Sequence, residues 1–396
     1  MLIRNVSLLY GKELDYVKNT NVRISGKRIE QIGEKLSPRK NEKVLDCEGL
    51  LMMPGLINSH THIGDSIAKD IGLDSDVEEK IHPVSGFKQK ILKNSDKSHL
   101  TSFVRNSCVS MIKKGITTFI DFREGGIEGV NLLKNTTLKI PIRPVILGRI
   151  EFYQDSKSVK KNTTIPKSYK SELRNLLMNC NGLGISGPNE FSDSSLRYFA
   201  KSGKIRAIHS AETEEGNKLS QKLTGKTETQ RALLMKPNFL VHMTCASKKD
   251  LVIANKNRVS IVVCPRANGS LAEGIPDIDL MLDAGCNVAI GTDNVMINSP
   301  DIFREMDYLW KVSMGIKKKR LSPKNILKMA TTNASNLVGG RVGIIQNDKI
   351  ADCIFIEKHS IDLEPMHNPY ASIVQRASEN SIKAVMYEGE LIHGKI

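Results

Sequence analysis

The stretch PGLINSHTHIG, residues 54–64, decides how the rest of the chain is interpreted. Its apolar run ends in two histidines, His60 and His62, which are two positions apart. Side chains at positions i and i+2 of a β-strand point to the same face, so both imidazoles can lie on one side of a strand end. Two histidines at this spacing are common by themselves. They indicate a shared metal ion only if other ligand-type residues come to the same place.

Short apolar segments that end in small or polar residues recur from residue 54 to about residue 340. Amphipathic stretches such as residues 102–114 lie between them. This alternation is typical of parallel strands separated by helices. Eight such units predict an α/β protein built on a (β/α)8 TIM barrel. The eight segments begin at Leu51, Gly115, Ile142, Gly182, Arg206, Phe239, Ser260 and Asn287.

The two ends of the chain have a different pattern. Residues 1–53 and 341–396 carry alternating, strand-like runs separated by turn residues. Neither end has enough strands to form a stable sheet alone. We therefore expect both ends to pair into one small β-sandwich domain beside a barrel domain of residues 54–340.

Composition and charge limit the class of protein. The seven cysteines are odd in number and form no CxxC pair, which favours a reducing cytoplasm over a disulfide framework. No stretch approaches the roughly 20 apolar residues of a membrane span. The 58 Lys and Arg exceed the 43 Asp and Glu to give a formal charge of +15. Because the basic residues are scattered among acidic ones, we interpret them as a solvated surface and do not expect nucleic-acid binding.

Ligand-type residues stand at the ends of three more predicted strands. His209 ends the fifth segment, His242 the sixth and Asp293 the eighth. The C-terminal ends of barrel strands meet at the rim where this fold places its active sites. With His60 and His62, His209 and Asp293 supply three nitrogens and one oxygen, a set suited to Zn²⁺ or Fe²⁺ with a position open for water. Such an ion lowers the pKa of its water towards about 7.

Two residues beside these ligands are candidates for proton transfer and charge stabilisation. Glu212 follows His209 by three positions, and a carboxylate there can carry a proton from water to a leaving nitrogen. The alternative is an ordinary surface glutamate at a helix start. His242 is either a further ligand or a donor to negative charge on the substrate. We favour the donor role, because the other four residues already complete a mononuclear site.

Together these motifs resemble the amidohydrolase superfamily, in the branch of cytosine, guanine and adenosine-type deaminases and chlorotriazine hydrolases. The resemblance runs nearly end to end through PGLINSHTHIG, HSAE, VHMT, GTDN, ATTNASNLVGG and IADCIFIE. It implies that Glu212 is the proton shuttle, that His242 orients the hydroxide or polarises the substrate, and that Asp293 also accepts a proton from the attacking water. The metal ligands that it implies are His60, His62, His209 and Asp293.

One absence distinguishes between branches of this superfamily. Its binuclear members carry a carboxylated lysine on the fourth strand, whereas the fourth segment here, GLGISGPNE, contains no lysine. This favours a single metal ion and deaminase chemistry. The HxE and PCxxC signature of the zinc deaminases of another fold is also missing from the sequence.

Other residues near the same rim are candidate substrate contacts, and each has a purely structural alternative. Arg149 could pair with a neighbouring glutamate, Phe87 could belong to the core, and His82 could be a turn residue before a proline. The candidates are Arg266 and Asn268 after the seventh segment, Arg149 at the end of the third, Glu190 after the fourth, and His82 and Phe87 in the long connection after the first.

The sequence thus predicts a mononuclear metal-dependent hydrolase that deaminates a nitrogen heterocycle, such as a purine, pyrimidine or nucleoside. One alternative keeps the site but cleaves an amide, an alkylamine or a chlorotriazine. Another keeps the fold as a non-catalytic scaffold. The expected cofactor is one divalent ion, Zn²⁺ ahead of Fe²⁺, and the expected partners are a small heterocyclic substrate and a second subunit in a homodimer.

Overall fold

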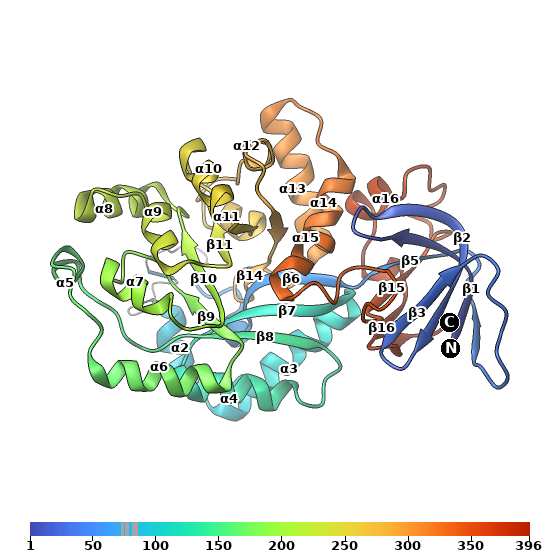
Figure 1. Ribbon diagram of the computed structural model, residues 1–396, viewed down its shortest axis with the longest axis horizontal. Helices are drawn as coiled ribbons and strands as arrows, with labels where there is room; N and C mark the ends of the chain where they lie inside the picture. Colours follow the sequence, from blue (N-terminus) through green and yellow to red (C-terminus); the bar gives the residue numbers. More distant parts are fainter. Residues whose placement is uncertain (73–74, 76–78, 81–85) are drawn as a thin grey trace.

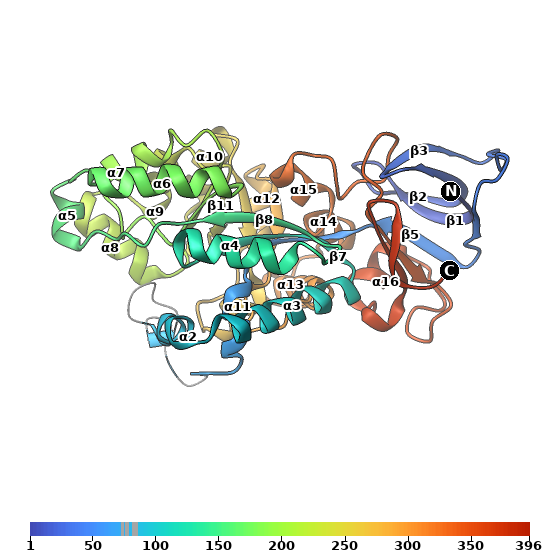
Figure 2. The same ribbon diagram turned by 90° about the horizontal axis from the view of Figure 1, so that it is seen from below.

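A computed structural model describes residues 1–72, 75, 79–80 and 86–396 of the chain. Two sheet-based parts are visible (Figure 1): a ring of strands surrounded by helices, and a strand-rich part in which both termini lie. The second view shows the two termini close together on that strand-rich part (Figure 2). Within the described ranges, the chain forms no helix that combines the length and the apolar character needed to cross a membrane.

The ring contains strands from all eight predicted segments, paired in parallel with their neighbours along the chain, while residues 51–54 of the first segment belong to the sheet of the chain ends. The eighth segment is split, and its two parts close the ring: β13 pairs with β12, and β14 pairs with β6. Between them the Thr292 N–H donates to the His60 carbonyl at 3.1 Å. The strands are β6 (Leu56–His62), β7 (Ile116–Arg123), β8 (Arg143–Gly148), β9 (Gly182–Ile185), β10 (Ile205–Ser210), β11 (Phe239–His242), β12 (Ser260–Val263), β13 (Val288–Ile290) and β14 (Asp293–Asn294).

The barrel strands are buried along most of their length, and β8 and β10 are partly exposed only at their first two residues. Every residue of β6 and of β7 is buried, because helices cover the outside of a parallel barrel and side chains fill its inside. An apolar cluster that includes Ile57, Phe122 and Val241 fills the interior. The reactive polar side chains are therefore collected at the rim formed by the strands' C-terminal ends.

Helices follow the strands around the ring, as the amphipathic stretches predicted. The first long one, α3, ends just before Gly115, whose φ of 74° lies in the left-handed region that favours glycine. The helices of this part are η1 (Ile63–Ala68), α2 (Phe87–Asn94), α3 (Lys97–Lys113), α4 (Gly126–Thr137), α5 (Ser156–Lys160), α6 (Lys167–Asn179), α7 (Asp193–Phe199), α8 (Glu214–Thr224), α9 (Glu228–Ala232), η2 (Leu233–Met235), α10 (Lys248–Lys256), α11 (Pro265–Ser270), α12 (Ile278–Asp283), α13 (Ile302–Lys317), α14 (Pro323–Met329), α15 (Thr332–Ser335) and η3 (Asn336–Val338).

The two chain ends pair with each other in one strand-rich sheet. Strand β5 joins them, since it is parallel to β1 and antiparallel to β15. Residues of both ends, including Ile3, Met52 and Phe355, share one apolar cluster. The limits of the predicted domains, 1–53 plus 341–396 and 54–340, stay a prediction. The elements are β1 (Leu2–Tyr10), β2 (Asp15–Ser25), β3 (Arg28–Gly33), β4 (Val44–Asp46), β5 (Leu50–Pro54), β15 (Cys353–Glu357), α16 (Pro369–Gln375), η4 (Glu379–Ser381), β16 (Ile382–Tyr387) and β17 (Glu390–Gly394).

Candidate active site

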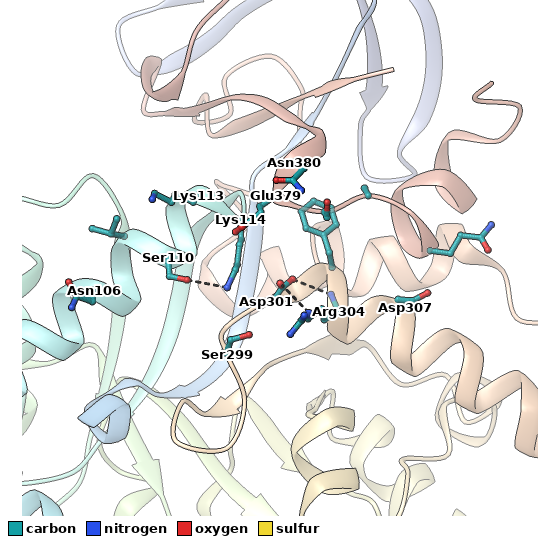
Figure 3. Close-up of a pocket in the computed structure, with 15 residues that line it drawn as sticks. Asn106, Ser110, Lys113, Lys114, Ser299, Asp301, Arg304, Asp307, Glu379 and Asn380 are labelled. Atoms are coloured by element: carbon teal, nitrogen blue, oxygen red, sulfur yellow. Dashed lines mark hydrogen bonds and ion pairs between the residues drawn. The ribbon is translucent and has the colours of Figure 1, made fainter. Parts of the chain in front are cut away.

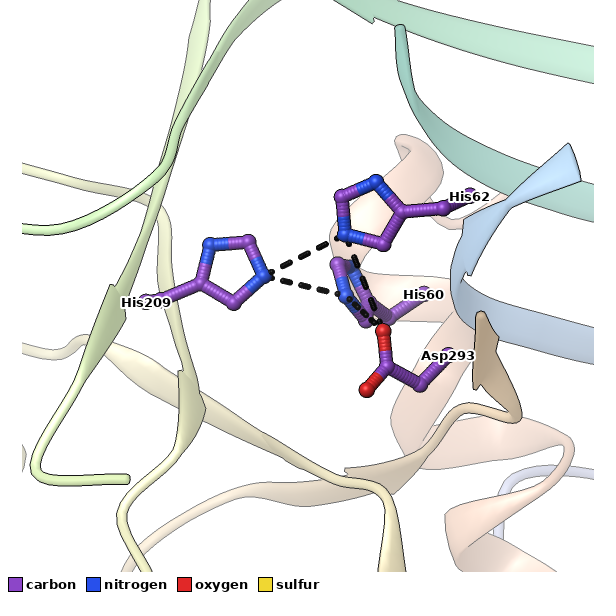
Figure 4. Close-up of side chains that lie close together, drawn as sticks. All are labelled: His60, His62, His209 and Asp293. Atoms are coloured by element: carbon purple, nitrogen blue, oxygen red, sulfur yellow. Dashed lines mark hydrogen bonds and ion pairs between the residues drawn. The ribbon is translucent and has the colours of Figure 1, made fainter. Parts of the chain in front are cut away.

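Three imidazoles and one carboxylate converge at the rim of the barrel (Figure 4). His60 and His62 come from the end of β6, His209 from β10 and Asp293 from the start of β14. His60 Nε2 lies 3.2 Å from Asp293 Oδ1 and 3.2 Å from His209 Nε2. His62 Nε2 lies 3.5 Å from His209 Nε2. One ligand atom from each of the four residues falls within 4.8 Å of all the others, and all four residues are buried.

The hydrogen bonds behind two of these rings show which nitrogens are free. His209 Nδ1 donates to the Ile185 carbonyl at 3.0 Å, and His62 Nδ1 donates to Glu124 Oε1 at 2.7 Å. Burial lowers the pKa of both imidazoles, so each ring carries one proton and keeps a lone pair on Nε2. Two lone pairs that face each other repel unless a cation lies between them. The donor set therefore fits a divalent metal ion, and its three nitrogens and one oxygen match the ligand preference of zinc.

The backbone around the ligands is strained in places. Asp293 and His242 have φ values of 60° and 72°, in the left-handed region that costs most residues energy. Gly291 passes so close to β6 that a Cβ there would lie 2.7 Å from the His60 backbone nitrogen. Only glycine lets the eighth segment approach His60 in this way.

Glu212 and His242 lie beside the four ligands. His242 Nε2 is 3.2 Å from Glu212 Oε1. Behind the ring, Asn268 Nδ2 donates to Glu273 Oε2 at 2.9 Å and lies 3.2 Å from His242 Nδ1. The Asn268 amide oxygen lies further from this ring nitrogen, at 3.5 Å, so we assign His242 Nδ1 as the acceptor and place the ring proton on Nε2. Glu212, His242 and Asp293 also lie close enough to hold an ion, but a protonated Nε2 suits a hydrogen-bond donor and not a ligand.

The protonation states of the carboxyl groups differ across the site. Burial raises the pKa of Glu212 well above its usual range, and the charges of Glu273 and Asp293 raise it further. Burial also raises the pKa of Glu273 to about 7, and the closeness of the two glutamates favours holding one proton between them. Burial acts in the same direction on Asp293, but its hydrogen bond and charge interactions with His60 keep the pKa of Asp293 well below its usual range. Glu212 therefore holds a proton more readily than the neighbouring Asp293, whose environment favours the ionised form.

The site opens into a cavity of about 1230 Å³. Arg149 and Glu190, two of the candidate substrate contacts, line it together with His62, His209 and Glu212. Arg149 is buried, and its Nε has no hydrogen-bond partner among the described residues. The structure thus brings Arg149 and Glu190 to the same cavity as the ligand cluster.

The other candidate contacts that the structure describes do not line this cavity. Asn268 is buried behind His242. The Arg266 guanidinium pairs with Glu305 at 3.4 Å, and Arg266 is not among the described residues that line the cavity. Phe87 is 37% exposed on α2 and does not line the described part of the cavity either. His82 lies outside the described residues.

Several polar residues at the site were not singled out from the sequence. Glu124 directly follows β7, and its position at a strand end was a signal that could have identified it. Lys88 on α2 contacts Glu124 at 2.6 Å, and Asp65 in η1 contacts Lys88 at 3.5 Å. Neither belongs to a barrel strand, and neither does Glu273. For these three residues the sequence alone held no spacing that points to the rim.

A second cavity, of about 670 Å³, lies between α3, the start of α13 and the segment after α16 (Figure 3). Lys114 in it donates to Ser110 Oγ at 3.1 Å, and Arg304 lies 4.0 Å from Asp301. Both basic and acidic side chains line this cavity. Neither of the residue groups that could hold a metal ion lies in its described lining. The cavity at the barrel rim is the better candidate for chemistry.

A parallel barrel with three histidines and an aspartate at its C-terminal rim has the architecture of a metal-dependent hydrolase. The family model described as "Amidohydrolase family" matches residues 51–392. The chain belongs to this family, which confirms the resemblance inferred from the motifs.

Individual relatives extend this comparison over the whole chain. A protein of Methanothermobacter thermautotrophicus, provisionally named an aminohydrolase, is 36% identical over 396 residues and covers 99% of each chain. The 5-methylthioadenosine/S-adenosylhomocysteine deaminase of Pyrococcus furiosus is 26% identical, covering 99% of this chain and 94% of its own. The crystal structure of atrazine chlorohydrolase from Arthrobacter aurescens, complexed with zinc, has a TM-score of 0.84 at 18% identity. It covers 99% of this chain and 95% of the other, which confirms the predicted fold.

Proposed function

We propose that the protein is a mononuclear metal-dependent deaminase, which replaces an exocyclic amine of a nitrogen heterocycle with oxygen and releases ammonia. Membership of the amidohydrolase family and the deaminase among its relatives support this class of reaction. The observation that carries the proposal is the position of the Glu212 carboxyl, 3.2 Å from His242 and directly beside the ligand cluster, where burial raises its pKa and favours the protonated form. An amine leaves readily only when it receives a proton, and a neutral acid can supply one.

His60, His62, His209 and Asp293 would hold the ion. We assign one ion, and zinc ahead of Fe²⁺, because β9 contributes no lysine and three imidazoles with one carboxylate are typical of zinc. A divalent ion at this position would make water a better nucleophile by lowering its pKa.

Residues of the chain itself would transfer the protons and stabilise the negative charge that develops on the substrate. The ionised Asp293 carboxylate accepts a proton as water attacks the ring carbon. Glu212 delivers its proton to the ring nitrogen, the proton accepted by Asp293 passes to the leaving amine, and Glu212 takes back the hydroxyl proton as the carbonyl forms and ammonia leaves. The His242 Nε2–H, which the Asn268 amide fixes in this tautomer, stabilises the negative charge that develops on the substrate.

Arg149 and Glu190 are the candidate contacts that we place closest to the substrate. Arg149 and Glu190 line the cavity, and Asn268 acts through His242. For the protein as a whole we propose a cytoplasmic location and a homodimer.

Zinc-loaded protein should be assayed for ammonia release with cytosine, guanine, adenine nucleosides including 5-methylthioadenosine, and aminotriazines. Ammonia is expected from at least one of them, with one metal ion per chain by elemental analysis. Turnover that releases chloride or an alkylamine and no ammonia would overturn the proposal and favour a hydrolase that cleaves a chlorotriazine or an alkylamine. Protein that binds no metal would favour the scaffold.

A further inference from the structure

A buried ionic network contacts His62 at Nδ1, the ring nitrogen that does not face the other ligands. Glu124 Oε1 receives two hydrogen bonds, from His62 Nδ1 at 2.7 Å and from Lys88 Nζ at 2.6 Å. Glu124 and Lys88 are 2% and 3% exposed. Charged groups are almost never buried to this extent unless they are paired.

The same lysine reaches a second support of the site. Lys88 Nζ lies 3.5 Å from Asp65 Oδ2. Asp65 accepts from Asn294 Nδ2 at 2.7 Å and from the Met296 N–H at 3.0 Å. Asn294 is the neighbour of Asp293 in β14. Lys88 is thus the common partner of one carboxylate that holds His62 and another that holds the strand of Asp293.

We infer that Glu124 is a positioning residue for His62: it accepts from Nδ1 and so turns the Nε2 lone pair toward the metal, and Lys88 holds the Glu124 carboxylate at this position. This inference rests on the proposed metal site. A carboxylate that accepts from the far nitrogen of a histidine fixes the tautomer and raises the basicity of the ligating nitrogen, and the loss of such a partner typically weakens metal binding 10- to 100-fold.

The alternative is that Glu124 is only the counter-ion of Lys88, with no effect on His62. A matched pair of double variants separates these roles. Both variants carry Lys88→Met, so that no buried lysine loses its partner. One adds Glu124→Gln, which keeps an oxygen acceptor for His62 Nδ1–H, and the other adds Glu124→Met, a side chain of similar size with no strong acceptor.

The readout is zinc affinity, measured by competition with a chromophoric chelator and independent of any substrate. We expect the Glu124→Met pair to bind zinc at least 10-fold more weakly than the Glu124→Gln pair, with equal unfolding temperatures of the two metal-free proteins. Equal zinc affinities would overturn the inference. If wild-type protein binds no zinc at all, the proposed function itself fails, which is a separate result.

Glu124→Asp with Lys88 unchanged tests the inference should either double variant fail to fold. It keeps both buried charges but withdraws the carboxylate by one methylene group. A counter-ion role tolerates this change, whereas a positioning role predicts weaker zinc binding and an altered visible spectrum of the cobalt-substituted protein. Wild-type affinity and an unchanged spectrum in Glu124→Asp would contradict the positioning role.

Discussion

His62 and His209 face each other through their Nε2 atoms, 3.5 Å apart, and neither atom carries the ring's proton. Each ring donates its only proton in the opposite direction, His62 to Glu124 and His209 to the Ile185 carbonyl. The two Nε2 lone pairs therefore point at the same position, and a cation bound there would remove the repulsion between them.

Removal of metal should therefore destabilise the protein as well as inactivate it. Binding to the folded chain alone stabilises by about 4 kcal/mol when free ligand is about a thousandfold above Kd. We expect treatment with a chelator to lower the unfolding temperature by several degrees in differential scanning calorimetry, and zinc to restore it. Mg²⁺, which prefers oxygen ligands, should not restore it. An unfolding temperature that is insensitive to zinc would contradict a structural contribution from the ion.

Glu212→Gln should lower kcat by about 10²- to 10⁴-fold, the usual contribution of a positioned acid or base. The amide keeps the size of the side chain but has no acidic proton to deliver. Metal content by elemental analysis should stay at the wild-type value, because Glu212 is not one of the four proposed ligands. Wild-type turnover in this variant, on a verified substrate, would exclude Glu212 as the shuttle.

Gly291→Ala should disrupt the metal site through the backbone. The new Cβ would lie 2.7 Å from the His60 nitrogen, a distance that forces β6 or the eighth segment to move. We expect zinc affinity to fall at least 10-fold. Gly315→Ala is the matched control, since a Cβ there meets nothing within 4 Å and alanine stabilises helix interiors by about 0.5 to 1 kcal/mol. Equal zinc affinities of the two variants would show that Gly291 does not constrain His60.

Arg149→Met and Arg266→Met should differ in their effect on substrate binding. Arg149 lines the cavity, and its Nε has no hydrogen-bond partner in the described part of the chain, whereas the Arg266 guanidinium is paired with Glu305. We expect Arg149→Met to raise KM by 10-fold or more and Arg266→Met to change KM little. Steady-state kinetics on the substrate found in the ammonia screen provides the measurement, and the reverse order of effects would move the substrate towards α11.

Glu228 should make the protein less stable as the pH rises. It accepts the Ala211 N–H at 2.7 Å, and burial raises its pKa to about 7 in the folded chain from 4.5. The folded chain therefore holds a proton that the unfolded chain releases between these values, and this contribution is complete below pH 4.5 and lost as the pH passes 7. We expect the free energy of unfolding to fall by about 1 to 3 kcal/mol between pH 5 and pH 8, relative to Glu228→Gln. Urea titrations of both proteins at the two pH values measure this difference, and parallel pH profiles would show that Glu228 does not titrate in this range.

The fold and the ligand cluster were predictable because they follow from a repeated local pattern. Each barrel strand is a short apolar run, and the residue at its end must lie at the rim, whatever the loops do. The sequence therefore predicts that His60, His209 and Asp293 lie close together at the rim. The two chain ends were predictable for a related reason, since neither could complete a sheet without the other.

Partners that depend on the course of a loop or on tertiary packing were not predictable. Lys88 lies on a helix after a long connection, and only the folded chain shows that its ammonium reaches Glu124. Glu273 lies beyond α11, at no spacing that relates it to Glu212. Arg266 follows the seventh strand as the active-site pattern requires, yet its backbone N–H and its guanidinium both bond to Glu305.

The closure of the ring by the eighth segment has a consequence for how the protein is made. His60 and Asp293, which touch at the rim, are 233 positions apart in the chain. A ribosome must therefore synthesise nearly three quarters of the protein before the last ligand meets the first. Until then, any metal ion that the three histidines bind lacks the Asp293 carboxylate as a ligand. The pairing of β5 with β15 forms later still, because β15 is synthesised only after residue 352. The complete ligand set and the paired sheet of the chain ends thus form only late in synthesis.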